Sequence, residues 1–152
     1  MKEVLNKRLE KLDKHYEALI EYKKLIDKLG DVYNVTNFNF LPYEKRAYLE
    51  SYLKRFASIQ DYLGAKIFPL LIELSGISNT KKMSEILNLV SKEEIIDIDK
   101  WLEIRRLRNE LEHDYPDDLE EALKDLKVCV DNYDYLIEIR EKIEKFINEN
   151  IR

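Results

Sequence analysis

Side chains capable of chemistry gather at one point in the sequence, the stretch RRLRNELEHDYPDD from Arg105 to Asp118. Within it, Arg108 lies five residues before His113. Histidine titrates near pH 6.5, so at neutral pH it can exchange a proton with an RNA 2′-hydroxyl. A guanidinium can hold a phosphate and stabilise the charge that grows on it. Arg108 and His113 together would therefore permit RNA strand cleavage that needs neither a metal nor a cofactor.

The same residues also have an interpretation without catalysis. Arg108 can pair with Glu112 at the i+4 position of a helix, and His113 can interact with the negative end of that helix. Tyr115 can cover the hydrophobic core. Residue types alone leave both interpretations open.

Charge restricts how RNA can be bound. The net charge is −5 and the isoelectric point is near 5.2, which argues against a broad surface that coats nucleic acid. Arg105 and Arg106 are the local exception, one turn before Arg108. They are expected either to hold RNA phosphates without reading bases or to form an ordinary exposed helix face.

The elements that must position these residues are helices. Apolar side chains recur every three to four residues, and only 3 Gly and 3 Pro leave little material for turns. The chain is long enough for one hydrophobic core. The sequence predicts an all-α fold, an antiparallel bundle of four to five helices in a single domain over residues 1–152, with helices at about 2–29, 43–75, 81–90, 96–115 and from 117 onward.

Particular residues mark where these helices begin, bend and end. Gly30 is expected to end the first helix, and Gly64 and Pro69 mark a bend or break in the second. Asp97 or Asp99 is expected to cap the helix that carries Arg108. In chain order, the helix that carries Arg108 is therefore expected between the helix at about 81–90 and the last helix.

Two further segments carry specific expectations. The stretch GDVYNVTNFNFLP, residues 30–42, lacks a helical period and is expected to be a connector that packs its aromatic side chains onto the body. Asp117 or Asp118 is expected to open one long last helix. Its inward positions are predicted to be Leu119, Leu123, Leu126, Val130, Tyr133 and Ile137.

Other functional motifs are missing from the sequence. It contains no Gly-rich phosphate loop, no paired cysteines and no HExxH motif. The Asp97-x-Asp99 pair is better explained by helix capping than by metal binding. His15 is expected to be a surface histidine, and the single cysteine, Cys129, a small buried side chain. The ten tyrosines recur with Leu and Ile at helical intervals, which indicates core packing rather than a platform for bases.

The sequence also bears on location. Its longest apolar run, IFPLLI, is far shorter than the roughly 20 residues that a membrane helix needs. The N-terminal residues MKEVLNKRLEKL carry charges throughout, unlike a signal peptide. A single cysteine fits a reducing compartment. A cytoplasmic protein without membrane contact is therefore expected.

The stretch RLRNELEHDYPDD resembles the motif of HEPN-domain proteins, in which Arg is followed by a polar residue, three others, His, any residue and Tyr. It is most similar to the HepT-like toxins of HepT/MntA toxin–antitoxin systems. The resemblance covers about Trp101–Leu119, and RFASIQDYLGAKIF resembles the second-helix region of the same proteins. The rest of the chain agrees in helix order and length.

This resemblance implies a HEPN-like helical bundle that forms a homodimer and cleaves RNA without a metal. It implies that Arg108 and His113 are catalytic and that Asn109 supports the site. It further implies a partner, a small MntA-type nucleotidyltransferase antitoxin, that silences the toxin by AMPylating Tyr115. The alternative is a non-catalytic HEPN relative, a substrate-binding subunit of a nucleotidyltransferase, in which the same helix end holds a nucleotide or a partner.

Helical geometry sets a condition on this site. Five residues of an ideal helix leave Arg108 and His113 roughly 140° apart around the axis. Either the helix loosens before Pro116 so that His113 turns toward Arg108, or two copies meet and each contributes a pair. Both arrangements fit a cleft between two subunits.

Overall fold

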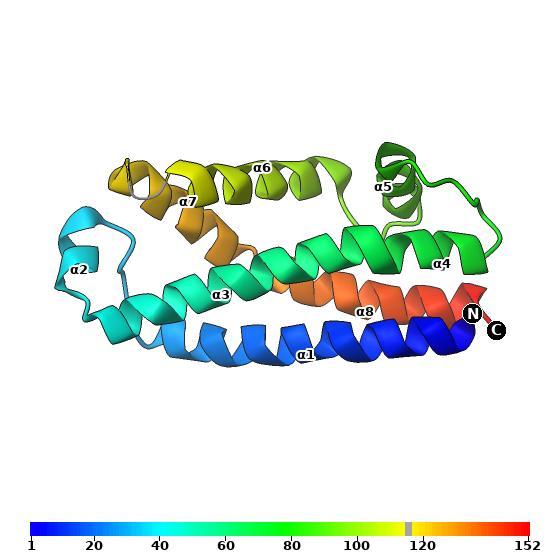
Figure 1. Ribbon diagram of the computed structural model, residues 1–152, viewed down its shortest axis with the longest axis horizontal. Helices are drawn as coiled ribbons and strands as arrows, with labels where there is room; N and C mark the ends of the chain where they lie inside the picture. Colours follow the sequence, from blue (N-terminus) through cyan, green and yellow to red (C-terminus); the bar gives the residue numbers. More distant parts are fainter. Residues whose placement is uncertain (115–116) are drawn as a thin grey trace.

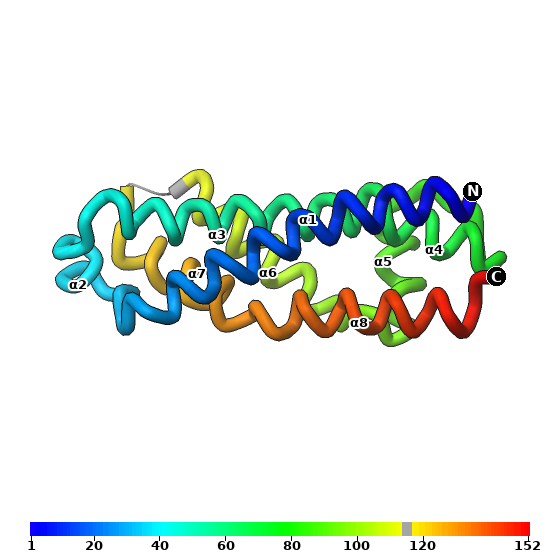
Figure 2. The backbone as a smooth tube through the Cα atoms, turned by 90° about the horizontal axis from the view of Figure 1, so that it is seen from below, coloured from blue at the N-terminus to red at the C-terminus, as the bar shows by residue number. Residues whose placement is uncertain are grey.

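The chain folds as an antiparallel helical bundle in the computed structural model, which describes residues 1–114 and 117–152. Helix α1 (Lys2–Asp27) leads away from the end that holds both termini, and the rod of α3 (Tyr43–Tyr62) and α4 (Phe68–Leu74) returns to it. Helix α6 (Ile98–Asp114) leads away again, and α7 (Leu119–Asp131) and α8 (Tyr133–Asn150) return (Figure 1). The bundle is elongated, as the second view shows (Figure 2). The described residues contain no strand, which confirms the all-α prediction.

The first two long helices form as their apolar spacing predicts. Helix α1 buries a stripe that includes Leu5, Leu12 and Leu19, and Gly30 follows its end with a positive φ of 75°. Helix α3 buries Tyr52 and Phe56 completely. These stripes meet because α1 and α3 lie side by side over most of their lengths (Figures 1 and 2).

The prediction of a connector over residues 30–42 is wrong in part. Residues Val35–Phe40 form a short helix, α2, which Asn34 caps by accepting a hydrogen bond from the Asn37 amide at 2.8 Å. One cap and two turns suffice here because Phe38 is anchored in the core. Phe40, in contrast, is 83% exposed, so only some of the aromatic side chains pack onto the body.

The predicted break around Gly64 and Pro69 takes the form of a π-helical turn, η1 (Leu63–Ile67), between α3 and α4. Pro69 stands in the first turn of α4, directly after the π-helical turn. The extra residue of a π turn shifts the buried face, and Leu63 and Ile67 both remain fully buried. The rod therefore continues past Gly64 without losing contact with the core.

The helix that carries Arg108 begins where the sequence predicts. Short helix α5 (Met83–Lys92) precedes it, and Asp97 caps α6 by accepting a hydrogen bond from the Lys100 amide at 3.1 Å. Asp97 is thus the residue that fulfils the capping interpretation of the Asp-x-Asp pair. The Tyr135 hydroxyl contacts the backbone amide and carbonyl of Asp97 at 3.2 and 3.1 Å, which ties the start of α6 to α8.

The prediction of one long last helix is wrong. Asp118 does open α7, accepting a hydrogen bond from the Glu121 amide at 3.2 Å. The helix then ends at Asp131, because Asn132 leaves the helical conformation and its side chain donates to the Val128 carbonyl at 2.8 Å. This break shifts the phase of α8, so that Tyr133 and Ile137 are only half-buried. The fully inward positions of α8 are Tyr135, Leu136, Ile139, Ile143 and Phe146.

Cys129 is fully buried, as predicted, and burial raises the pKa of its thiol to about 12. Within the part of the chain that the structure describes, no helix is both long and apolar enough to cross a membrane.

Candidate functional site

Arg108 is the one arginine of the Arg105–Asp118 stretch that points into the protein. Its side chain is only 6% exposed, and it lies on the buried face of α6 between Leu107 and Leu111. A buried guanidinium needs acceptors for its donors, because an unpaired charge away from water is costly. The surrounding helices must therefore provide them.

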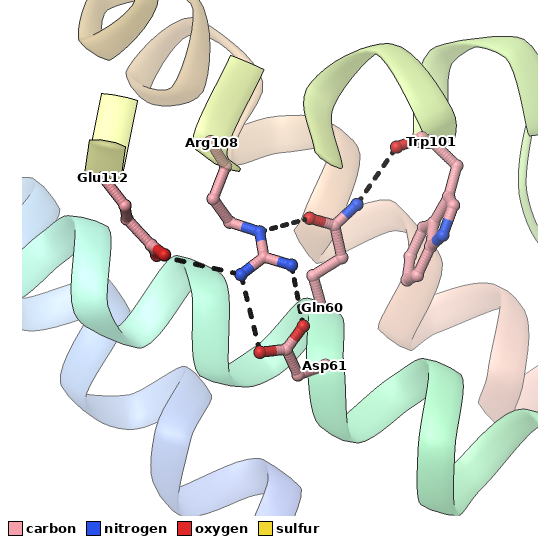
Figure 3. Close-up of polar contacts among 5 residues, drawn as sticks. All are labelled: Gln60, Asp61, Trp101, Arg108 and Glu112. Carbon is pink, nitrogen blue, oxygen red and sulfur yellow. Dashed lines mark hydrogen bonds and ion pairs between the residues drawn. The ribbon is translucent and has the colours of Figure 1, made fainter. Parts of the chain in front are cut away.

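Helix α3 supplies these acceptors (Figure 3). The Nε of Arg108 donates to the Gln60 Oε1 at 3.1 Å, and its Nη2 and Nη1 donate to the two carboxylate oxygens of Asp61 at 2.7 and 3.4 Å. Gln60 in turn donates from its Nε2 to the backbone carbonyl of Trp101 at 3.1 Å. The result is a chain of hydrogen bonds from the start of α6, through α3, back to Arg108.

The two partners of Arg108 differ in their contact with water. Gln60 is 3% exposed, whereas the Asp61 side chain is 65% exposed. The guanidinium is therefore anchored from the inside by an amide and neutralised from the outside by a carboxylate. Only the Asp61 side of the contact is open to exchange with a solvent anion.

The expected i+4 contact between Arg108 and Glu112 is present but long, with 3.9 Å between Nη1 and a carboxylate oxygen. Because the Glu112 side chain is half exposed, this contact contributes little to stability. Asp61 is the principal charge partner.

His113 and Asn109 are both exposed on α6. The helix keeps its α-helical geometry through Asp114, so it does not loosen before His113. The first of the two ways to bring Arg108 and His113 together is therefore not seen. Within one chain, His113 faces solvent while Arg108 faces α3.

Arg105 and Arg106 are exposed, as either interpretation of them requires, but their surroundings differ. Arg106 binds Glu103 at 2.8 Å and Glu110 at 2.6 Å, and hydrogen bonds to these carboxylates raise its pKa. Arg105 instead borders a small cavity of about 260 Å³ beside the Arg108 cluster. The other residues that line this cavity are Gln60, Asp61, Gly64, Ala65, Met83 and Trp101.

Tyr115, the predicted site of modification, lies outside the described residues. Among the described residues, no group of His, Cys, Asp or Glu side chains is placed to hold a metal ion.

Sequence reasoning missed Gln60 and Asp61. A signal for Gln60 exists in the sequence, since it falls on the inward face of α3 that carries Phe56 and that Leu63 continues into η1. A polar side chain at a core position is rare unless it is hydrogen bonded, so Gln60 points to a buried partner. Nothing in the local sequence identifies that partner as Arg108.

Comparison of the chain with protein-family models, curated proteins and solved structures finds no match.

Proposed function

We propose that the chain is a HEPN-like toxin of the HepT type, a metal-independent endoribonuclease that acts on cellular RNA in the cytoplasm. The observation that carries this proposal is the motif at the end of α6, in which Arg108, Asn109, His113 and Tyr115 occur at the spacing of the HepT-like proteins. The resemblance also implies control by an MntA-type nucleotidyltransferase that AMPylates Tyr115. AMP on Tyr115 would add negative charge beside the site and repel the RNA phosphate.

His113 has the exposure that a proton-transfer residue needs. It stands in the last turn of α6 and faces solvent, so an RNA strand can reach its ring. In the proposed reaction His113 takes the proton of a 2′-hydroxyl, and the 2′-oxygen attacks the adjacent phosphorus to form a 2′,3′-cyclic phosphate. The bond from phosphorus to the 5′-oxygen breaks, and the 5′-oxygen leaves as a hydroxyl after taking a proton from water. Exposed Asn109 is available to hydrogen bond the same phosphate.

Arg108 takes part by exchanging one anion for another. Its Nη1 and Nη2 atoms hold the Asp61 carboxylate, which is largely exposed, while its Nε atom stays on Gln60. A phosphate presents the same pair of oxygens to a guanidinium as a carboxylate does. We therefore propose that RNA displaces Asp61 from Arg108, with Gln60 keeping the guanidinium in place.

A second copy of the chain would complete the site, because Arg108 and His113 do not face one point within one chain. Two features at the same end of the bundle support a partner there. Phe40 and Tyr43 are 83% and 84% exposed. An apolar hollow of about 220 Å³ lies between α2, α3, α6 and α7. Its lining is mostly apolar, with three charged residues at its border: Phe38, Leu49, Leu53, Leu111, Ala122, Leu123 and Leu126, and the charged Arg46, Glu50 and Glu112. Exposed apolar surface of this kind commonly marks an interface.

Cleavage of RNA in the presence of EDTA tests the proposal. The wild-type protein should cut, and His113→Ala should cut nothing while its circular dichroism stays helical. Lys124→Ala, a change at an exposed residue of α7, serves as the matched control and should cut normally. Full activity of His113→Ala would disprove its catalytic role.

Mixing two impaired variants tests the shared site. If the Arg and His of one centre come from different subunits, a mixture of His113→Ala and Arg108→Lys chains should recover part of the activity. Arg108→Lys keeps the charge but loses the planar fork, so by itself it should cut far more slowly than wild type. A monomeric mass by light scattering at micromolar concentration would refute the shared site.

One observation favours a second candidate, the non-catalytic substrate-binding subunit of a nucleotidyltransferase. Arg108 is already bonded to Gln60 and Asp61, as a purely structural arginine would be. In that case Arg108→Lys would lower stability, while the wild-type protein would bind a nucleotide or a nucleotidyltransferase without cutting RNA.

A further inference from the structure

A strip of basic and aromatic side chains runs along the seam between α1 and α3, on a different side of α3 from Asp61. We call it the α1–α3 basic strip and define it as Arg8, Lys11 and His15 of α1 with Arg55, Tyr62 and Lys66 of α3 and η1. On α1 its members follow one another at three- and four-residue intervals, and so they share one flank of the helix.

Four contacts join the two sides of the strip. Arg8 donates to the Lys66 backbone carbonyl at 2.8 Å, and the Arg55 Nη1 lies 3.0 Å from the His15 Nδ1. The ammonium group of Lys11 lies 5.4 Å from the centre of the Tyr62 ring, and the rings of His15 and Tyr62 are 6.5 Å apart. The strip is thus a continuous surface, although the chain itself is acidic.

The cations of the strip lack carboxylate partners within the described part of the chain. Among the described residues, no carboxylate forms an ion pair with Arg8, Lys11, Arg55 or Lys66. This sets them apart from Arg106 and Arg140, each of which binds two carboxylates. A row of unpaired cations repels itself and is stabilised by a bound anion.

Two acidic side chains that are close to the strip in sequence bind other residues. Asp61 precedes Tyr62 but holds Arg108, and Asp13 of α1 binds Arg140 of α8 at 2.7 Å. The pKa of His15 is lowered, by burial first and then by Arg55 and Lys11, which indicates a positive potential at the middle of the strip.

We propose that the α1–α3 basic strip binds the sugar–phosphate backbone of single-stranded RNA. This inference rests on the proposed function, because the strip by itself would suit any polyanion and the proposed ribonuclease activity identifies RNA as the one that is bound. Cations beside the rings of His15 and Tyr62 suit a single strand, since its phosphates can meet the cations and its bases can stack on exposed parts of the rings. It extends the contact with RNA beyond α6, where Arg106 is already paired with carboxylates.

Fluorescence anisotropy with a labelled 2′-O-methyl oligonucleotide tests this inference. The methyl groups remove the attacking hydroxyl, so binding is measured whether or not the protein cleaves RNA. Lys11→Gln/Lys66→Gln removes two exposed cations, and Lys142→Gln/Lys145→Gln on α8 removes the same charge elsewhere. Loss of two single-strand phosphate contacts should lower the slope of log Kd against log salt by about 1.4. The control pair should bind nearly as the wild type does.

An equal loss in both pairs, or no loss in the strip pair, would overturn the inference. The inference would also be overturned if the wild-type protein did not bind the oligonucleotide but sedimented with phosphatidylserine vesicles through the same two lysines. Failure of the proposed function can be distinguished from failure of the strip. A protein that binds through the strip but cuts no RNA loses its catalytic assignment and keeps the strip. A nuclease whose KM is unchanged by Lys11→Gln/Lys66→Gln keeps its catalytic assignment and loses the strip.

Discussion

Replacing Gln60 with leucine should destabilise the protein far more than replacing Asp61 with alanine, although Asp61 carries the charge that neutralises Arg108. Gln60 satisfies two groups at once, the Arg108 Nε and the Trp101 carbonyl, and it does so out of reach of water. Leucine fills most of the same volume, so the cavity contribution is small.

The magnitude follows from the groups left without partners. Each buried donor or acceptor that loses its hydrogen bond costs about 1–3 kcal/mol, so the loss of two such partners in Gln60→Leu should lower the free energy of unfolding by roughly 2–6 kcal/mol. The carboxylate of Asp61 is 65% exposed, and water can take its place on Arg108. Asp61→Ala should therefore cost only about 1 kcal/mol, near the range of exposed ion pairs.

Urea denaturation measures both values. Circular dichroism follows the helices, and fluorescence follows Trp101, the only tryptophan, which is 3% exposed. An Asp61→Ala variant that loses as much stability as Gln60→Leu, or more, would refute this reasoning. It would mean that Arg108 is held mainly by its charge partner, and the proposed exchange of Asp61 for phosphate would then lose its energetic basis.

Three further predictions concern other parts of the molecule. His15 faces Lys11 on its own helix and Arg55 and Tyr62 on α3, and its pKa is held below 6.5 in the folded chain, so its contribution to stability should be full above pH 6.5 and be lost as the pH falls through the lowered pKa. His15→Gln should therefore lose less stability than the wild type between neutral and acidic pH in urea titrations, and equal losses in the two proteins would contradict this. Cys129, with a thiol pKa raised to about 12 by burial, should react with Ellman's reagent only after unfolding, and rapid labelling of the native protein at pH 8 would show that the core around it opens. Asp97→Ala removes the cap of α6 and should lower the free energy of unfolding by about 1 kcal/mol, while Asp99→Ala, two residues later, should lower it by less. Equal losses of stability would show that the Asp97 cap contributes nothing specific.

The sequence by itself determined most of the helices and most of their ends, because these depend on residues close together in the chain. Apolar spacing predicts the buried stripes of α1 and α3, and Gly30, Asp97 and Asp118 act within a turn of the ends that they define. Local signals were insufficient where a side chain competes with the helix. Asn132 ends α7 by bonding the Val128 carbonyl, although the apolar spacing continues past it.

Only the tertiary structure decided the surroundings of the motif and the position of the basic strip. Arg108 lies 48 residues from Gln60, and Arg55 lies 40 residues from His15. No periodicity within one helix shows which side chain of another helix will stand opposite. That depends on how α1, α3 and α6 rotate and align when their apolar faces pack. This packing buried Arg108 against α3, left His113 in solvent, and brought the cations of α1 and α3 together.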